Sequence, residues 1–466
     1  MDEQVSRLIA VTPHPRQIAW QQLEFTAFFH FGVNTFTGRE WGDGSEDPGI
    51  FNPRNLDTDQ WCEALKSAGI RAAILTAKHH DGFCLWDTKQ TKHSVMHSPY
   101  GRDIVRQLAD SCRKYGLKLG IYLSPWDRHE PRYGQGEPYN DYFCAQLTEL
   151  LTGYGELYCL WFDGACGEGA NGKRQRYDWE RYYRLIRSHQ PNACISVCGP
   201  DVRWCGNEAG HCRRAEWSVV PAALQSAERV SEKSQQEDSE AFRQCPISSQ
   251  DEDLGSRRAL EGEKELVWYP AEVDTSIRPG WFYHPQEDLQ VKSLETLQDI
   301  YLQSVGGNAV LLLNIPPDRE GLLAAPDVQR LREMGDFIAS LSVDLLKGAQ
   351  FSSSCEEKNH PASLLSEDGG YWKVPDTQPA AELTITAPQP VCARYLRLQE
   401  EIALSQRIEG FTLEAQDGEG WHTVCRGETV GYQRIVPFSQ PVTARQWRLK
   451  ITACRAGAAL KTVMLH

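Results

Sequence analysis

Short apolar segments alternate with helix-like segments from the N-terminus to about residue 315, and this alternation constrains the fold more than any other feature. We expect strands at residues 26–33, 71–83, 117–124, 157–164, 193–198, 215–220, 266–273 and 309–315. Helical spacing of apolar residues separates several of them, as over 56–68, 103–115, 139–154, 177–188 and 293–304. Strand and helix alternating about eight times is typical of an α/β fold of the (β/α)8 TIM-like barrel type.

The pattern changes after Lys347, where short alternating runs such as AELTITA and ARQWRLKITA are separated by turn residues. Such runs predict a small antiparallel β-sandwich. We therefore expect two domains, a catalytic barrel at 1–346 and an all-β sandwich at 347–466. The sandwich could bind glycan or support the barrel. The charged segment 225–264, rich in Ser, Gln and Glu, is expected to be an exposed loop between the sixth and seventh strands.

The charge balance narrows the class of partner. With 49 basic and 63 acidic residues, the net charge of -14 argues against nucleic acid or an anionic membrane surface. No apolar run is long enough to span a membrane. Fifteen cysteines without a CxxC pair, together with an N-terminus that lacks a secretory core, favour a cytoplasmic location. A trimmed signal peptide is the alternative, and the sequence indicates no oligomeric state.

Polar residues follow the ends of four expected strands: His30, His79 with His80, Tyr122 and Asp163. In a barrel the carboxyl ends of all strands meet at one face, so these side chains should converge there. Asp163 closes the aromatic run LYCLWFDG and is the first candidate for a catalytic carboxylate. An Asp that only caps the following turn is the alternative interpretation.

The histidines have two interpretations. His79, His80 and Asp81 could join His30 around a metal ion. Neighbouring residues on a strand point to opposite faces, however, so His79 and His80 could not both face inward without a bend. Neutral imidazoles that bind ligand hydroxyls need no such geometry, and we favour that interpretation, with no metal and no cofactor. A zinc site at Cys194/Cys198 and Cys205/Cys212 is a further alternative.

Sugar recognition combines polar groups for hydroxyls with an aromatic wall for the C–H face. Candidate aromatic walls are Trp41, Trp86, Trp161, Trp281 and Phe282. Cleavage of a glycoside needs a second carboxyl group opposite the first, kept protonated to help the leaving group. Glu208, in the Gly-flanked segment RWCGNEAG beside Trp204, is the preferred candidate. Its rivals on other loops are Glu40, Glu130 and Glu168.

Eight motifs in order, FFHFG, EW, TAKHHDGF, YLSPW, LWFDG, GNEAG, SIRPGWFYH and NAVLLLNIPPDREG, resemble the α-L-fucosidases of glycoside hydrolase family 29 over residues 10–340. The resemblance implies hydrolysis of α-L-fucosides with retention and an Asp nucleophile that corresponds to Asp163. It also implies a fucose pocket whose residues match His30, Glu40, Trp41, His79, His80, Tyr122, Trp161 and Trp281. The partner it implies is a fucosylated oligosaccharide or glycoconjugate.

The position of the acid/base residue varies across the family. In the branch that prefers α-1,3/4 linkages on branched Lewis-type glycans, the acid/base Glu lies in a segment resembling GNEAG, which implies Glu208. An Arg that binds fucose in the other branch has no clear match, which also favours the α-1,3/4 branch. The alternatives are a broader linkage range that includes α-1,2 or aryl fucosides, a metal-dependent barrel hydrolase, and a non-catalytic fucose-binding protein.

Overall fold

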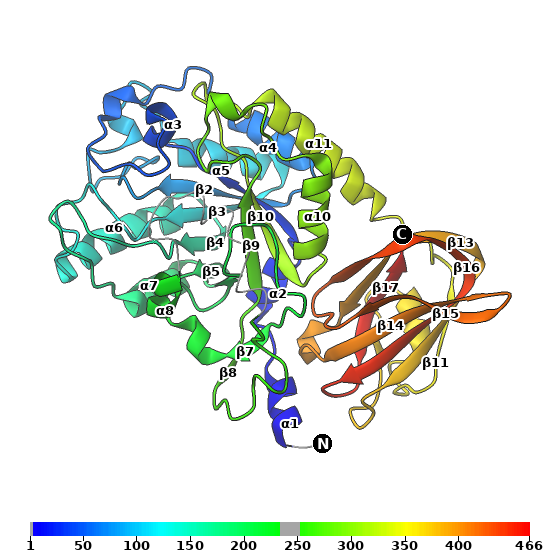
Figure 1. The fold of residues 1–466 in the computed structure, drawn as a ribbon. Coiled ribbons are helices and arrows are strands. Elements are labelled where there is room, and N and C mark those ends of the chain that lie inside the picture. Colours follow the sequence, from blue (N-terminus) through cyan, green and yellow to red (C-terminus); the bar gives the residue numbers. More distant parts are fainter. Residues whose placement is uncertain (1–2, 234–251) are drawn as a thin grey trace.

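A computed structural model of the chain describes residues 3–233 and 252–466. Parallel strands form the centre of the first domain, with helices around them, and an antiparallel β-domain packs beside the barrel (Figure 1). The central part of the expected loop 225–264, residues 234–251, lies outside the described residues. Its flanks are not the exposed loop that was expected, since residues 227–233 form a helix and Leu254 and Leu260 are buried. In the part of the chain that is described, no helix has the length and apolar content needed to cross a membrane.

Eight strands form the barrel sheet in the order β5-β4-β3-β2-β1-β10-β9-β6, with parallel pairing throughout. They are β1 (Phe25–Phe29), β2 (Ala72–Lys78), β3 (Lys118–Leu123), β4 (Leu157–Phe162), β5 (Cys194–Val197), β6 (Arg203–Trp204), β9 (Ala271–Ser276) and β10 (Ala309–Asn314). A parallel bridge between Ser196 and Val202 brings the two edges together, so the barrel is nearly closed. This confirms the predicted barrel class.

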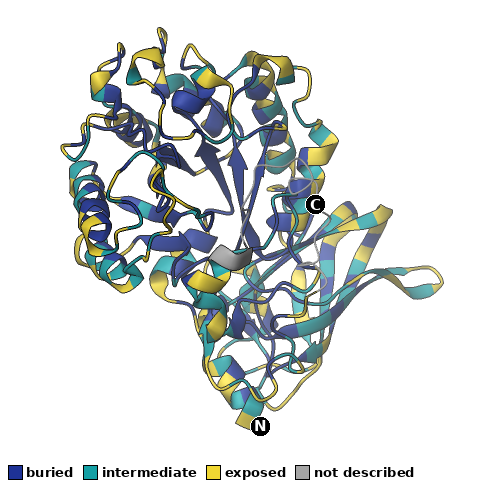
Figure 2. Cartoon of the chain, turned by 60° about the vertical axis from the view of Figure 1, so that its left-hand side comes forward, coloured by how far each residue is buried: buried dark blue, intermediate teal, exposed yellow. Residues whose placement is uncertain are grey.

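Most of the helices lie around the outside of the barrel (Figure 1); the first two precede β1 in the chain, and the first of all lies near the N-terminus, away from the barrel. They are α1 (Glu3–Ala10), α2 (Pro15–Gln21), α3 (Val33–Thr37), α4 (Thr58–Ser67), α5 (Ile104–Tyr115), α6 (Glu137–Gly153), α7 (Trp179–His189), α8 (Ala227–Lys233), α10 (Leu294–Ser304) and α11 (Ala325–Ser340). Local sequence sets their ends: Asp103 caps α5 by accepting from the Arg106 amide, and Gly116 ends it at φ 67°. The strands inside are almost wholly buried (Figure 2).

The predicted sixth and seventh strands are partly wrong. Residues 219–221 form β7 (Val219–Pro221), which pairs antiparallel with β8 (Leu266–Trp268) outside the barrel. The sixth barrel strand is the two-residue β6, whose buried Arg203 interrupts any apolar pattern. The expected strand 266–273 is split after Trp268, and its barrel part, β9, begins at Ala271, directly after Pro270, because proline cannot donate to a sheet ladder.

The C-terminal domain is a sheet of seven antiparallel strands. They are β11 (Gln350–Ser353), β12 (Trp372–Lys373), β13 (Ala381–Glu400), β14 (Ile408–Asp417), β15 (Gly420–Gly427), β16 (Arg434–Cys454) and β17 (Ala459–Leu465). The two long strands, β13 and β16, carry register shifts where their pairing is interrupted. Side chains from both ends of the sheet pack one apolar core that includes Trp372 and Trp447, in agreement with the predicted sandwich.

Candidate active site

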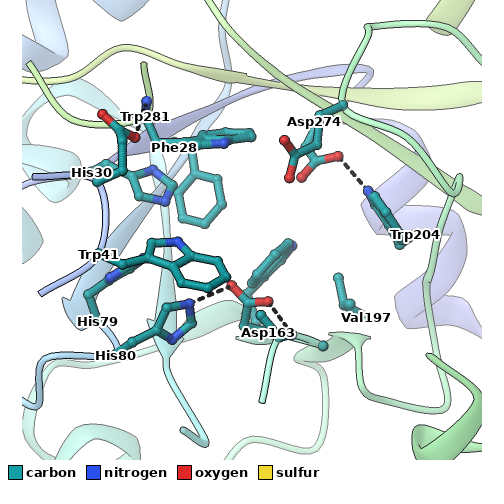
Figure 3. Close-up of a pocket in the computed structure, with 15 residues that line it drawn as sticks. Phe28, His30, Trp41, His79, His80, Asp163, Val197, Trp204, Asp274 and Trp281 are labelled. Carbon is teal, nitrogen blue, oxygen red and sulfur yellow. Dashed lines mark hydrogen bonds and ion pairs between the residues drawn. The ribbon is translucent and has the colours of Figure 1, made fainter. Parts of the chain in front are cut away.

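One pocket opens at the carboxyl ends of the barrel strands and encloses about 610 Å³ of empty space, counting the part open to solvent. Figure 3 shows aromatic rings, imidazoles and carboxylates facing it from several strands. The lining residues are Phe28, His30, Glu40, Trp41, His79, His80, Trp161, Asp163, Gly164, Ala165, Val197, Trp204, Glu208, Asp274 and Trp281. The residues expected to bind sugar or do chemistry lie in this wall except Tyr122, which lies directly behind it against Asp163. Of the candidate aromatic walls, Trp86 and Phe282 do not line the pocket: both are fully buried, and the Trp86 indole donates to Glu149 at 2.8 Å in the core.

Asp163 follows the last residue of β4 and is held in one orientation. Its Oδ1 accepts from the Ala165 amide at 2.7 Å and its Oδ2 from the Tyr122 hydroxyl at 2.9 Å. Its side chain is 22% exposed, toward the pocket. Burial raises the pKa of Asp163 to about 6, although these hydrogen bonds oppose the shift. At neutral pH the group is therefore a fixed carboxylate with one open face.

The hydrogen bonds around His30 define its tautomer. The Asn314 amide nitrogen donates to Ser276 Oγ at 2.9 Å and to the Trp281 carbonyl at 2.8 Å, so Asn314 Oδ1 must accept. His30 Nδ1 lies 2.8 Å from that oxygen and is therefore the protonated nitrogen. Burial lowers the pKa of His30 to about 3, so the ring is neutral and Nε2 is left as an acceptor.

His80 shows the same arrangement. Ser124 Oγ donates to the Trp126 carbonyl at 2.6 Å and accepts from His80 Nδ1 at 2.8 Å. His80 Nε2 then carries a lone pair and lies 3.8 Å from Asp163 Oδ2, which is too long for a direct hydrogen bond (Figure 3). Burial lowers the pKa of His80 to about 3. A ligand hydroxyl that approaches this pair could donate its proton to either acceptor.

His79 and His80 both reach the pocket, which on one continuous strand would have required a bend. The reason is that β2 ends at Lys78, after a register shift near Thr76, so the two histidines lie in the turn that follows the strand. Among the described residues, no group of three or more His, Cys, Asp or Glu side chains is arranged as a metal site would require. Cys194 and Cys198 contact different backbone carbonyls, those of Arg16 and Asp163.

Glu40 joins two parts of the pocket wall. Its Oε2 accepts from the Trp281 amide at 2.8 Å, and its Oε1 lies 2.6 Å from His284 Nε2. A Cβ at Gly280 would come within 2.6 Å of Glu40 Oε1, so a larger residue there would displace the Glu40 carboxylate. Glu40 thereby fixes the loop that carries the Trp281 indole, whose ring lies 5.0 Å from that of His30.

Two carboxyl groups on β9 were missed by the sequence analysis. Glu272 Oε1 accepts from the Trp161 indole at 2.6 Å, and Asp274 Oδ1 accepts from the Trp204 indole at 2.7 Å. Burial raises the pKa of Glu272 to about 8 and that of Asp274 to about 7. Asp274 lies across the pocket from Asp163 (Figure 3). In the sequence AEVDTS the two acids are two residues apart, so on a strand both point to the same face. The expected strand, 266–273, ended before Asp274, so this spacing was not recognised.

Glu208 reaches the pocket from the segment between β6 and β7. Asn207 shapes its turn, since Oδ1 accepts from the Ala209 amide at 3.0 Å and Nδ2 donates to the His211 carbonyl at 2.9 Å. Of the rival carboxylates, Glu40 is engaged as described, and Glu130 and Glu168 do not line the pocket. Glu208 and Asp274 are therefore the two carboxyl groups in this wall that could act opposite Asp163.

A strand-end carboxylate, further carboxyl groups in the same wall, neutral imidazoles and indole faces in one barrel mouth are the parts of a glycoside hydrolase site. A protein-family model described as alpha-L-fucosidase matches residues 45–342. The chain is 38% identical over 467 residues to Alpha-L-fucosidase 1 of Arabidopsis thaliana, covering 97% of this chain and 87% of the relative. The chain therefore belongs to the α-L-fucosidase family, glycoside hydrolase family 29.

Solved structures agree with this assignment. A candidate α-L-fucosidase from Bacteroides ovatus is 46% identical, with a TM-score of 0.86 over all of this chain and 75% of that one. A family 29 fucosidase from Ruminococcus gnavus, determined in complex with fucose, is 28% identical, with a TM-score of 0.83 over 98% of this chain and 95% of that one. The chain is thus a hydrolase of the fucosidase class with the barrel and sandwich of its relatives.

Proposed function

We propose that this enzyme removes terminal α-1,3- and α-1,4-linked L-fucose from branched Lewis-type glycans with net retention, using Asp163 as nucleophile and Glu208 as acid/base. The observation that carries the proposal is that both side chains line one pocket, Asp163 from a strand end and Glu208 from a separate segment. The two carboxyl groups of a retaining glycosidase must reach the same anomeric centre from different elements.

In the first step Asp163 Oδ attacks the anomeric carbon, and the C–O bond to the leaving sugar breaks as the Glu208 carboxylic acid gives its proton to the glycosidic oxygen. In the second step water attacks the fucosyl-enzyme ester, and Glu208, now a carboxylate, takes the proton from that water. The Tyr122 hydroxyl and the Ala165 amide keep Asp163 aimed at the sugar. Free fucose leaves with its original anomeric configuration.

The neutral imidazoles are proposed to bind fucose hydroxyls. His30 and His80 each present an Nε2 acceptor, because their Nδ1 protons are held by Asn314 and Ser124. Trp281 is proposed to contact the apolar face of the sugar. As the ring distorts toward an oxocarbenium ion, its hydroxyls become more acidic and these hydrogen bonds strengthen.

The linkage preference is supported by two observations. Glu208 lies in GNEAG, the segment that resembles the α-1,3/4 branch. Among the described residues, no arginine lines the pocket, so the fucose-binding Arg of the other branch has no counterpart there. Neither observation involves the leaving sugar, and direct comparison of substrates is therefore the test.

The decisive experiment compares Lewis a and Lewis x trisaccharides with 2′-fucosyllactose and an aryl fucoside, each with the wild-type and Glu208→Gln enzymes. We expect the wild type to prefer the Lewis sugars, and Glu208→Gln to lose about 100- to 10,000-fold on them because their leaving groups need a proton. Preference for 2′-fucosyllactose would refute the linkage proposal. Near-wild-type turnover by Glu208→Gln would refute its role and direct attention to Asp274. Loss of activity in EDTA, restored by zinc, would support the metal-dependent alternative.

A further inference from the structure

The segment that carries Glu208, residues 205–218, leaves the barrel after β6 and contains no helix or strand of its own. It begins with the Cys205 amide donating to the Glu272 carbonyl of β9 at 2.9 Å. Near its middle, Cys212 Sγ contacts the carbonyls of Gln303 and Gly307. A segment without regular structure must be positioned by such side-chain contacts.

The two ends of this segment are joined by a buried carboxylate. Glu216 Oε1 is bound by Arg203 of β6, and Glu216 Oε2 accepts from the Arg213 amide at 3.0 Å. Arg213 Nη1 also donates to the Cys205 carbonyl at 3.1 Å. Glu216 thus links the start of the segment to its end, and a shift of Glu216 would move the turn that holds Glu208.

The C-terminal sandwich holds the far end of the same segment. Gln406 is fully buried; its Nε2 donates to the Glu216 carbonyl at 3.1 Å, and its Oε1 accepts from the Ser218 amide at 2.8 Å. The Arg455 guanidinium lies 3.7 Å from the Trp217 ring centroid. These contacts fall on three consecutive residues, 216–218.

Other sandwich residues contact Arg214, two residues before Glu216. Arg434 Nη1 donates to the Arg214 carbonyl at 3.0 Å, and Glu428 pairs with the Arg214 side chain at 3.2 Å. Asn308 connects the two sides, since its Nδ2 donates to the Glu216 carbonyl and its Oδ1 accepts from the Tyr432 amide. The sandwich therefore contacts residues 214–218 through side chains from several of its segments.

We infer that the C-terminal sandwich acts as an internal support for the acid/base segment, with Gln406 as a positioning residue for Glu208. The inference rests on the proposed role of Glu208. Gln406 hydrogen-bonds the Glu216 carbonyl and the Ser218 amide. Its removal leaves the buried Ser218 amide without its acceptor. The segment must then shift to satisfy that amide, and a misplacement of about 1 Å can cost about 100-fold in rate.

The test compares two leaving groups. Lewis x trisaccharide needs a proton from the acid, whereas dinitrophenyl α-L-fucoside leaves without one, so the ratio of their kcat/KM values reports acid function and is independent of the amount of folded enzyme. Gln406→Ala should lose about 10- to 100-fold on Lewis x and less than about twofold on the dinitrophenyl substrate. Gln406→Glu, which keeps an acceptor for the Ser218 amide but loses the donor, should lie between.

Arg397→Gln is the matched control, because Arg397 joins the sandwich to the barrel through an ion pair with Glu24 rather than through residues 205–218. It should lower Tm while leaving the ratio of the two substrates unchanged. The inference would be overturned if the Gln406 variants lost activity equally on both substrates, or lost none. This holds provided that Glu208→Gln still loses more activity on Lewis x than on the dinitrophenyl fucoside. A Glu208→Gln enzyme without that dependence would instead overturn the acid/base assignment, and this inference with it.

Discussion

The two halves of the barrel differ in regularity. Strands β1 to β4 contain five to seven residues each and are followed by loops that deliver His30, His79, His80 and Asp163. Strands β5 and β6 contain four and two residues, and the chain leaves the barrel between β6 and β9 for a long excursion. Glu208 lies on that excursion.

The difference assigns different tasks to the two halves. Rigid strand ends suit groups that must keep one position against the sugar ring, such as the proposed nucleophile and the proposed hydroxyl acceptors. The proposed acid/base lies on an irregular segment that is held in place by hydrogen bonds of Glu216 and by contacts with the sandwich. Such a segment can be rebuilt around different leaving groups without disturbing the fucose site.

The largest effect is expected in the regular half. Asp163→Ala removes the proposed nucleophile and should reduce turnover by about 100,000-fold, the order seen when a covalent nucleophile is deleted. Steady-state hydrolysis of an aryl fucoside measures it, with the far-UV spectrum and Tm as checks of folding. A residual rate within about tenfold of wild type would mean that Asp163 is not the nucleophile.

A smaller loss is expected from His30→Ala. The change removes an acceptor for a fucose hydroxyl and leaves that hydroxyl unpaired in a buried site, which should cost about 1–3 kcal/mol, or about 5- to 150-fold in kcat/KM. The Tm and the far-UV spectrum of the variant serve as the control for its folding. Equal activity of His30→Ala and wild type would place the sugar elsewhere.

The acidic limb of the pH profile should report Asp163. Its pKa is raised to about 6 by burial, so the reactive carboxylate is present above that pH and is lost as the pH falls through it. We expect kcat/KM to fall by about tenfold for each pH unit below about 6. A limb near pH 4 would show that substrate-free Asp163 titrates like an ordinary exposed carboxyl group.

The smallest effect concerns Asp274, on the six-residue strand β9 that follows the long excursion. Asp274→Asn keeps an oxygen acceptor for the Trp204 indole and removes a carboxyl group that interacts electrostatically with Asp163. We expect kcat/KM to change by only about two- to threefold and the acidic limb to stay near pH 6, because Asp274, with a pKa raised to about 7, is already mostly protonated at that pH. A loss as large as that of Glu208→Gln would make Asp274 the acid/base.

The sequence predicted the regular half better than the irregular one. Asp163 and the histidines could be found because each directly follows an apolar strand, and strand ends converge in a barrel. The two-residue β6 leaves no periodic signal, and its Arg203 is tolerated inside only because Glu216 and backbone carbonyls compensate it. Gln406 could not have been found, because its partners are about 190 residues away in the chain.

Both carboxylate roles are tested most directly by the configuration of the fucosyl azide formed when azide rescues each variant, determined by NMR. With an activated α-fucoside, Asp163→Gly should give the inverted β-azide, because azide takes the place of the missing nucleophile. Glu208→Ala should give the retained α-azide, because azide attacks the fucosyl-enzyme from the opposite face. The same anomer from both variants, or a β-azide from Glu208→Ala, would contradict the account.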